Sequence, residues 1–333
     1  MTLAGNFHTI EPMKAFVTGG TGFIGSHLID FLSARDAEIF ALVRNPDKAA
    51  GLRGKKINVL KGDLFSLPSF PNGIDIVFHL AGKTRALKAT QYYTVNQEGT
   101  ASLFRALVAS GARPKVIYLS SLAASGPSEK DKRARENDPP HPVTPYGRSK
   151  LLGEQEALKF KDKFPLVIVR ASAVFGPGDR DFFEYFKIVS KGILPTVRGG
   201  KLASLCYVKD LVEALYLCAE RDLPSGEIFN IAAPEPWTWE KLGEATGLAL
   251  GRKIRKVRIS MAFAFLVALL SELVEHLKGE PGRFNCDKYT DLKQPGWVAD
   301  VDKAAAWLSF RPRYSLEKAL QETIDWYIAE NWL

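Results

Sequence analysis

The chain has 333 residues, of which 46% are hydrophobic and 25% charged, an ordinary balance for a globular protein. Its formal net charge of +8 is spread over many segments in which Lys and Arg stand near Asp or Glu. We interpret this excess as a solvated surface with a bias toward anionic ligands, and not as a nucleic-acid-binding stripe. The cysteines lack metal-ligand spacing and are odd in number, which predicts a reducing compartment, no disulfide framework and no metal site; they are Cys206, Cys218 and Cys286.

The N-terminus lacks the basic start and apolar run of a signal peptide, and residues 1–12 are predicted to be a loose extension. The most apolar segment, Met261 to Leu270, is a run of ten residues, too short to span a bilayer. These two observations predict a cytoplasmic protein.

Residues 13–25, MKAFVTGGTGFIG, combine a strand, a glycine turn and the start of a helix. A short buried strand is predicted over 14–18, helical apolar spacing follows over 26–32, and glycines recur between them at every third position, Gly19, Gly22 and Gly25. The first glycine allows a tight turn, the next lets a pyrophosphate approach the backbone, and the last lets the helix pack on the strand. The free N–H groups of the helix start then face the anion, so this stretch predicts a bound dinucleotide.

A second strand is predicted over 38–43, and Arg44 follows it, nineteen residues beyond Gly25. In a dinucleotide fold this position faces the adenosine ribose, where an acid binds the 2′-hydroxyl of NAD and an arginine accommodates the 2′-phosphate of NADP. Arg44, helped by Lys48 or Arg53, therefore favours NADP, with NAD as the alternative. The plainer interpretation is a solvated arginine at a strand end.

Strands and helices then alternate. Strands are predicted over 57–60, 74–80, 115–119 and 166–170, and helices over 94–110 and after residue 146. This alternation predicts an α/β fold with a doubly wound parallel sheet, whose ligands lie at the carboxyl ends of the strands. After residue 172 strands and helices no longer alternate regularly. A helix is predicted over 182–191, another over 208–221, a strand over 227–231 and two or three helices beyond it.

Tyr146 and Lys150 are four residues apart at a helix start, which places both side chains on one face, one turn apart. A tyrosine has an ordinary pKa of about 10, and a neighbouring ammonium or a cationic nicotinamide ring favours its phenolate. Ser121, at the end of the fifth predicted strand, can hold a substrate hydroxyl or carbonyl. The predicted reaction is hydride transfer between a nicotinamide ring and a secondary alcohol or ketone carbon, with Tyr146 moving the proton. The Y-x-x-x-K spacing by itself is common on ordinary helices.

Six motifs carry a resemblance to a known family. They are GGTGFIG at 19–25, HLAG at 79–82, VNQEGT at 95–100, YLSS at 118–121, YGRSK at 146–150 and VFGPGD at 174–179. In their order and approximate spacing the chain resembles the extended short-chain dehydrogenase/reductases, also called the NAD-dependent epimerase/dehydratase family. The likeness extends to the closing segment FRPRYSLEKALQETIDWY.

The resemblance implies a catalytic triad of Ser121, Tyr146 and Lys150, with Lys150 also holding the nicotinamide ribose and Asn96 as a supporting helix residue. His79, on an apolar strand, is interpreted as a packed core histidine. Cofactor contacts are expected around the pyrophosphate, at the adenine, along the cofactor and after the sixth strand, from Gly19, Gly22, Phe23, Ile24, Gly25, Asp63, Leu64, Leu80, Ala81, Gly82, Ala171 and Val174.

In this interpretation an NAD(P)-binding Rossmann domain is formed by residues 13–172 and about 204–232. A smaller, mostly helical substrate-binding lobe is formed by residues 173–203 and 233–333. The resemblance also suggests a homodimer through the helix containing Tyr146 and the helix preceding it.

At two positions the chain departs from the family's sequence pattern, and these departures narrow the range of expected reactions and substrates. Nucleotide-sugar dehydratases carry Asp-Glu just after the catalytic hydroxyl residue, whereas this chain has Leu122-Ala123-Ala124, which argues against dehydratase and decarboxylase chemistry. Sugar-nucleotide enzymes often place a diphosphate-gripping arginine where this chain has Ala203, although Lys201 or Arg198 could substitute. The segment YLSSLAASGP at 118–127 instead looks like the branch that includes 3β-hydroxysteroid dehydrogenases and dihydroflavonol reductases.

A helix capped by Ser260 is predicted over the apolar run that begins at Met261, and it has almost no polar face until Glu272. Such a helix is normally buried, which is the favoured interpretation. The alternatives are the wall of an apolar pocket or a patch resting on a membrane surface, aided by the basic run RKIRKVR at 252–258.

The main hypothesis is an NAD(P)-dependent oxidoreductase that acts on a hydroxyl or keto group of a small, moderately apolar molecule. The alternatives are a nucleotide-sugar 4-epimerase, which needs only the same hydride cycle, and a non-catalytic NAD(P)-binding sensor or assembly subunit. The intact Ser121, Tyr146 and Lys150 argue against the last of these.

Overall fold

The computed structural model describes residues 12–47, 49, 57–129, 132–197, 199–282 and 284–333. Within these residues a seven-stranded parallel sheet has the strand order β11-β6-β5-β4-β1-β2-β3. The strands are β1 (Lys14–Thr18), β2 (Glu38–Val43), β3 (Ile57–Lys61), β4 (Ile76–His79), β5 (Lys115–Ser121), β6 (Leu166–Ala171) and β11 (Glu227–Ile231). This confirms the predicted doubly wound α/β fold. The chain reverses its direction of travel across the sheet between β1 and β4, so ligands are expected where these two strands end.

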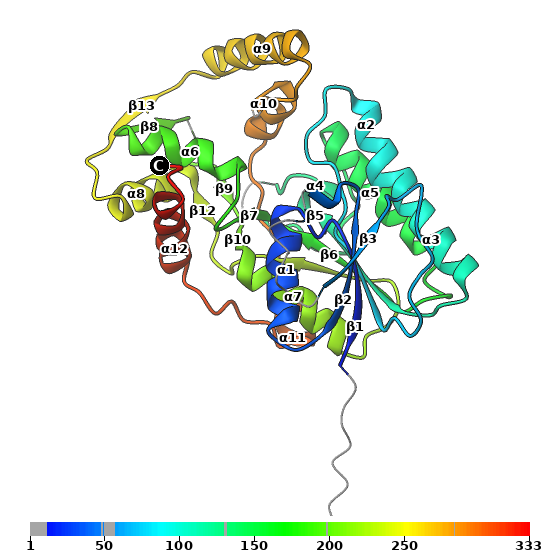
Figure 1. Cartoon of the computed structure of the whole chain (residues 1–333). Helices are drawn as coiled ribbons and strands as arrows, with labels where there is room; N and C mark the ends of the chain where they lie inside the picture. The colour runs from blue at the N-terminus through cyan, green and yellow to red at the C-terminus, as the bar shows by residue number, and fades with distance from the viewer. Residues whose placement is uncertain (1–11, 48, 50–56, 130–131, 198, 283) are drawn as a thin grey trace, which may run out of the picture.

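Helices cover both faces of the sheet (Figure 1). One face carries α1 (Phe23–Ser33), α7 (Val208–Glu220) and α11 (Asp302–Trp307), and the other carries α3 (Gly99–Ser110) and α5 (Pro145–Leu158). Because both faces are buried, the strands are almost continuously apolar, which explains why the sequence shows short apolar runs and little alternation.

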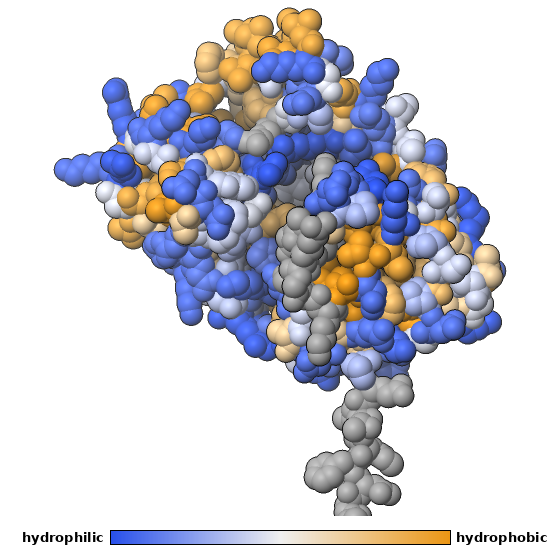
Figure 2. Space-filling view, viewed as in Figure 1, coloured by the Kyte–Doolittle hydropathy of each residue, from blue (hydrophilic) through white to orange (hydrophobic). Residues whose placement is uncertain are grey.

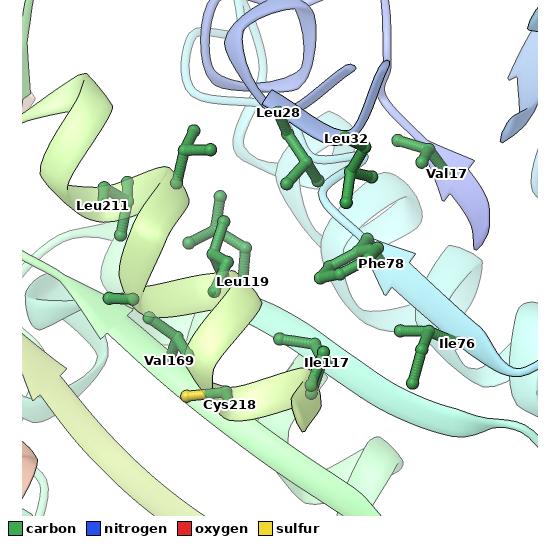
Figure 3. Close-up of a cluster of buried hydrophobic side chains, with 14 of the residues drawn as sticks. Val17, Leu28, Leu32, Ile76, Phe78, Ile117, Leu119, Val169, Leu211 and Cys218 are labelled. Atoms are coloured by element: carbon green, nitrogen blue, oxygen red, sulfur yellow. The ribbon is translucent and has the colours of Figure 1, made fainter. Parts of the chain in front are cut away.

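Successive strand residues point to opposite faces and so divide the core into two clusters. On one face Val17, Phe78, Leu119 and Val169 meet α1 and α7 (Figure 3). On the other face their chain neighbours meet α3 and α5; these neighbours are Phe16, Val77, Tyr118 and Ile168. A slip of one residue in any strand would exchange the two sets, so the register of the strands, and with it the position of every strand end, is strongly specified.

The C-terminal lobe is mostly helical, as predicted. Its helices are α6 (Asp181–Ser190), α8 (Trp239–Ala249), α9 (Met261–Lys278), α10 (Cys286–Lys293) and α12 (Leu316–Ala329). Short strand pairs join them, namely β7 (Ala173–Phe175) with β10 (Leu205–Tyr207), β9 (Leu202–Ala203) with β12 (Trp237–Thr238), and β8 (Ile193–Thr196) with β13 (Arg255–Arg258). A third core cluster, rich in aromatic residues such as Phe186, Trp237 and Tyr327, holds α6, α8 and α12 together.

Several element boundaries differ from the sequence prediction, most of them by one or two residues. The strand expected over 74–80 is shorter, since β4 covers Ile76–His79. The helix expected over 94–110 begins earlier, at α2 (Ala89–Tyr93), and contains a π-helical turn, η2 (Thr94–Glu98), before α3. The extra residue in such a turn rotates the following side chains relative to an unbroken α-helix.

The favoured interpretation of the apolar helix was wrong. In α9 only Ala264, Ala268 and Glu275 are buried, while Phe263, Leu270 and all other large apolar side chains except the half-buried Met261 are exposed. The reason is geometric: α9 stands away from the sheet and packs on α10 along one narrow stripe (Figure 1). No helix in the described part of the chain is both long enough and apolar enough to cross a membrane.

Candidate active site

The glycine turn between β1 and α1 is pressed against the end of β4. Gly19 has a φ of +75°, and a Cβ there would lie 2.7 Å from the backbone nitrogen of Ala81. The Gly19 carbonyl accepts a hydrogen bond from the Gly22 N–H at 3.0 Å, and a Cβ on Gly25 would collide with the same carbonyl. No side chain caps the helix start at Gly22. The turn therefore presents backbone N–H groups that fit a pyrophosphate.

His79 joins the ends of β1 and β4 to η2 through a chain of buried hydrogen bonds. The Ala81 N–H donates to Thr18 Oγ1 at 3.1 Å, and Thr18 Oγ1 lies 2.8 Å from His79 Nδ1. At the other side of the ring Thr100 Oγ1 donates its only proton to the Asn96 carbonyl at 2.7 Å and therefore accepts from His79 Nε2 at 3.0 Å. In a neutral ring with its proton on Nε2, Nδ1 is an acceptor, so the Thr18 hydroxyl donates to it.

The pKa of His79 agrees with that assignment. Burial, with the Lys150 charge as a smaller cause, lowers it to about 3. The ring is fully buried and stacks on Tyr118 with centroids 5.2 Å apart. These observations support the interpretation of His79 as a packed core histidine.

Asn96 lies in the π-helical turn η2 and ties the loop after β4 to the helix that carries Tyr146. Its Oδ1 accepts from the Lys83 N–H at 2.7 Å, and its Nδ2 donates to the Lys83 carbonyl at 3.0 Å and to Ser149 Oγ at 2.8 Å. Ser149 Oγ in turn donates to the Tyr146 carbonyl at 2.7 Å. Every polar atom of the buried amide side chain is thus engaged in positioning backbone, which fits the supporting role expected of this residue.

Tyr146 and Lys150 lie on the first turns of α5. The helix starts at Pro145, and Thr144 caps it by accepting the Gly147 N–H at 3.2 Å. Ser121 stands at the end of β5, where it caps the short helix α4 (Leu122–Ser125) by accepting the Ala123 N–H at 3.2 Å. The Ser121 hydroxyl lies near enough to the Tyr146 phenol to lower the pKa of that phenol.

Burial shifts the titration of both α5 residues. It raises the pKa of Tyr146; the Ser121 hydrogen bond lowers this pKa and the nearby Asp291 raises it. The sequence predicts that the neighbouring ammonium favours the phenolate, whereas in the structure desolvation of the phenol is the largest influence on this pKa. Burial lowers the pKa of Lys150 from 10.5 to about 8, and Glu154 partly offsets this. The Lys150 ammonium donates to the Leu119 carbonyl at 2.7 Å.

A buried ion pair beneath Lys150 was missed by the sequence reasoning. Arg170 binds Glu154 through Nε at 2.9 Å and Nη2 at 2.7 Å, and Ser120 Oγ donates to Glu154 Oε1 at 2.5 Å. Both charged side chains are almost inaccessible to solvent. One signal was available: Glu154 follows Lys150 by four residues, as Lys150 follows Tyr146, so all three lie on one face of α5.

The Tyr146 side chain borders a small cleft whose opposite wall is α10. Tyr92 meets the Tyr146 ring edge-on, with centroids 5.9 Å apart. Across the cleft stand four polar residues of α10 and its start, Asn285, Asp287, Lys288 and Asp291. Burial raises the pKa of Asp287 and of Asp291. An ion pair between Arg85 and Asp181 joins the loop after β4 to α6, on the C-terminal lobe.

Comparison with known proteins agrees with this geometry. Residues 15–232 match the NAD dependent epimerase/dehydratase family. The chain belongs to this family. The relatives of the chain include proteins named as dehydrogenases, reductases, epimerases and dehydratases. As a member of this family, the chain is an enzyme of the oxidoreductase type that binds NAD.

Two curated relatives align with nearly the whole of this chain. Ceramide reductase from Caulobacter vibrioides is 27% identical over 322 residues, covering 95% of each chain. The 3beta-hydroxysteroid-dehydrogenase/decarboxylase isoform 1 of Arabidopsis thaliana is 26% identical over 353 residues, covering 93% of this chain and 78% of that one.

Solved structures give the same fold. MoeE5 in complex with UDP-glucose and NAD superposes with a TM-score of 0.73 at 26% identity, covering 96% of this chain and 99% of that one. The UDP-glucuronic acid 4-epimerase from Bacillus cereus, in complex with NAD, superposes with a TM-score of 0.77 at 23% identity, covering 96% and 100%.

The remaining cofactor residues expected from the family lie at the ends of the strands. Gly82 is close to both α5 and η2, because a Cβ there would lie 3.2 Å from Asn96 Oδ1 and 3.7 Å from Lys150 Nζ. Asp63 Oδ1 accepts the N–H groups of Phe65 and Ser66, both at 2.8 Å. The others border these strand ends or the first turn of α1 and are buried or half-buried; they are Phe23, Ile24, Leu64, Leu80, Ala81, Ala171 and Val174.

The remaining expectations concern residues that would bind a phosphate group of the cofactor or substrate. Arg44 is exposed directly after β2, and its two expected helpers, Lys48 and Arg53, lie outside the described residues. Ala203 is buried in β9 opposite Trp237. Lys201, expected as a substitute diphosphate ligand, donates to the Leu292 carbonyl at 2.5 Å and so holds the end of α10, while Arg198 lies outside the described residues.

The Gly19 turn provides a test of the cofactor site. Gly19→Ala should weaken NADH binding by more than about tenfold, or about 1.4 kcal/mol, because its Cβ would push the Leu80–Ala81 backbone away from the turn. Gly111→Ala is the matched control, since Gly111 has a similar φ of +72° but open space around its Cβ position. Fluorescence titration with NADH measures both. Equal affinities in the two variants would contradict the assignment.

Proposed function

We propose that this enzyme transfers a hydride between NAD(P) and a secondary alcohol or ketone of a small, moderately apolar molecule, with Tyr146 as general acid and base. The observation that carries the proposal is the position of the half-buried Tyr146 phenol, which has the Ser121 hydroxyl near it and lies one helical turn from the Lys150 ammonium. A phenol, a hydroxyl donor and a cation around one point are what proton transfer to a carbonyl oxygen requires.

Each group has a distinct task in the ketone-reducing direction. Ser121 holds the substrate oxygen, and Tyr146 gives that oxygen its proton. Since the pKa of Lys150 is about 8, its ammonium form predominates at neutral pH and stabilises the phenolate that Tyr146 becomes. Burial, which raises the pKa of Tyr146, keeps the proton on the phenol until negative charge develops on the substrate. The nicotinamide ring, when bound, supplies or accepts the hydride.

The cleft wall opposite Tyr146 is polar, and the preference for an apolar substrate over a sugar nucleotide rests on other features of the chain. The segment Leu122-Ala123-Ala124 adds no acid or base beyond Tyr146, which suits a simple oxidation or reduction. Ala203 offers no cation to a diphosphate, and Lys201 is occupied by the Leu292 carbonyl. Relatives that act on apolar molecules, the ceramide reductase and the 3beta-hydroxysteroid dehydrogenase, agree with this choice.

A nucleotide-sugar 4-epimerase is the second candidate. It is favoured by the fold shared with MoeE5, whose structure contains UDP-glucose and NAD. Calorimetric titration with UDP separates the two proposals: we expect no binding at micromolar UDP, whereas micromolar affinity would favour the epimerase.

Removal of the phenolic hydroxyl tests the proton-transfer role. Tyr146→Phe should lower kcat for reduction of a long-chain ketone or a 3-ketosteroid by about a hundredfold or more, with NADH affinity retained. Tyr216→Phe, on α7 far along the chain and packed on Phe31, is the control and should leave kcat unchanged. The proposed role of Tyr146 fails if Tyr146→Phe keeps its turnover.

Arg44 supports NADP as the physiological cofactor, with NAD as the alternative, because an exposed cation directly after β2 can pair with a 2′-phosphate. Arg44→Ala should weaken NADPH binding about tenfold or more and leave NADH binding unchanged. Parallel titrations with the two cofactors measure this, and NADH serves as the internal control. If the variant and the native protein bind NADPH equally, Arg44 does not contact the phosphate.

A further inference from the structure

Helix α9 has the opposite polarity from an ordinary surface helix. The stripe that it buries against α10 consists of small or polar residues, with Ala264, Ala268 and Glu275 at its centre. The face that it turns to solvent consists of large apolar residues: Phe263, Phe265, Leu266, Val267, Leu269, Leu270, Leu273, Val274 and Leu277. A surface helix normally does the reverse, so solvent is not the environment to which this face is suited.

The exposed face is continuous along the helix. Leu266, Leu270, Leu273 and Leu277 follow the spacing of four, three and four residues that keeps side chains on one side, and their exposed fractions are 51%, 54%, 58% and 79%. The 18 residues of α9 extend over about 27 Å. The space-filling view shows this face as an orange surface at the top of the molecule, where Figure 1 places α9 (Figure 2).

A row of cations precedes the apolar face. All four residues of β13 are exposed, and Ile259 and Ser260 alone separate this strand from α9. Lys256 pairs with Glu240 and Glu244. Four other cations before α9 have no ion pair with any residue in the described part of the chain; they are Arg252, Lys253, Arg255 and Arg258.

The acidic groups of α9 lie away from this surface. Glu275 is 4% exposed and faces Gly282, and Glu272 interacts with Cys286 at the start of α10. Positive charge and apolar area therefore occur next to each other, and the carboxylates placed beside β13, Glu240 and Glu244, pair with Lys256 and not with the four other cations. This combination complements an interface that has anionic groups above hydrocarbon, whereas a purely apolar protein partner would gain nothing from the cations.

The surface is also connected to the candidate active site. Phe265 contacts Tyr289 of α10, with ring centroids 5.0 Å apart, and α10 forms the wall of the cleft that faces Tyr146. The apolar face lies on the side of α9 away from α10, so the two helices α9 and α10 link it to the wall of the Tyr146 cleft.

We propose that α9 is a membrane-docking helix: its apolar face enters the interfacial region of an anionic bilayer, and the cations of residues 252–258 bind the lipid phosphates. This deepens the proposed function and rests on it in one respect, since the apolar alcohol or ketone would then be drawn from the same bilayer. The docking itself requires no turnover.

Vesicle flotation tests the docking. The native protein should float with phosphatidylcholine vesicles that contain phosphatidylglycerol, and pure phosphatidylcholine should retain at least about tenfold less protein. The double variant Leu266→Ser, Leu270→Ser and the double variant Arg255→Glu, Arg258→Glu should each lower binding to the anionic vesicles by about tenfold or more.

Matched variants control for general effects of polarity and charge. Val108→Ser with Ile328→Ser changes two exposed apolar residues on α3 and α12, and Arg105→Glu with Lys163→Glu reverses two exposed charges near α3 and the end of α5. Both should float as the native protein does, and far-ultraviolet circular dichroism should show that all variants are folded.

The alternative occupant of the surface is a second copy of the chain. The proposal is overturned if the native protein does not float, or if Leu266→Ser with Leu270→Ser floats normally. If the native protein does not float and sedimentation shows that Leu266→Ser with Leu270→Ser converts a dimer to a monomer, the apolar face is a contact between copies of the chain. Tyr146→Phe should float normally, so a failure of the proposed chemistry and a failure of docking are distinguishable.

Discussion

The close approach of the Gly19 turn to the end of β4 is the constraint on which the candidate site depends. This contact fixes the spacing between the ends of β1 and β4, at the point where the chain reverses its direction of travel across the sheet. The Thr18–His79–Thr100 hydrogen bonds carry the same constraint through the core to η2, and Asn96 carries it on to α5. The cofactor turn and the Tyr146 helix, more than a hundred residues apart in the chain, are therefore positioned by one continuous polar network.

The burial of Lys150 and the charge of the nearby Glu154 together determine whether Lys150 is a cation. The change in its pKa from 10.5 to about 8 corresponds to roughly 3 kcal/mol. A slightly larger penalty would neutralise the amine at physiological pH. The Glu154 carboxylate opposes the loss, and Arg170 and Ser120 hold that carboxylate in place. Removing one partner of a buried pair typically costs about 3–5 kcal/mol, so this arrangement is held far more firmly than a surface ion pair.

Features that depend on local chemistry could be predicted from the sequence. The glycine turn requires a positive φ at Gly19, and the Tyr146–Lys150 pair requires only helical spacing. Features that depend on distant partners could not. Arg170 lies on β6 and meets Glu154 only because α5 packs across that strand, and η2 arises within a segment whose sequence looks like an ordinary helix. For α9, hydrophobicity indicated that the helix needs an apolar environment, but the partner it packs on was not visible in the sequence.

The capping bond of Ser121 limits what its hydroxyl can do. One of its lone pairs accepts the Ala123 N–H, which holds the oxygen at the end of β5 and leaves its single proton as a donor. The hydroxyl also lowers the pKa of Tyr146, as a donor that favours the phenolate does. In the proposed reduction, negative charge develops on the substrate oxygen and then on the phenolate. One donor fixed by a helix cap can therefore serve both oxygens in turn without a change in its own position.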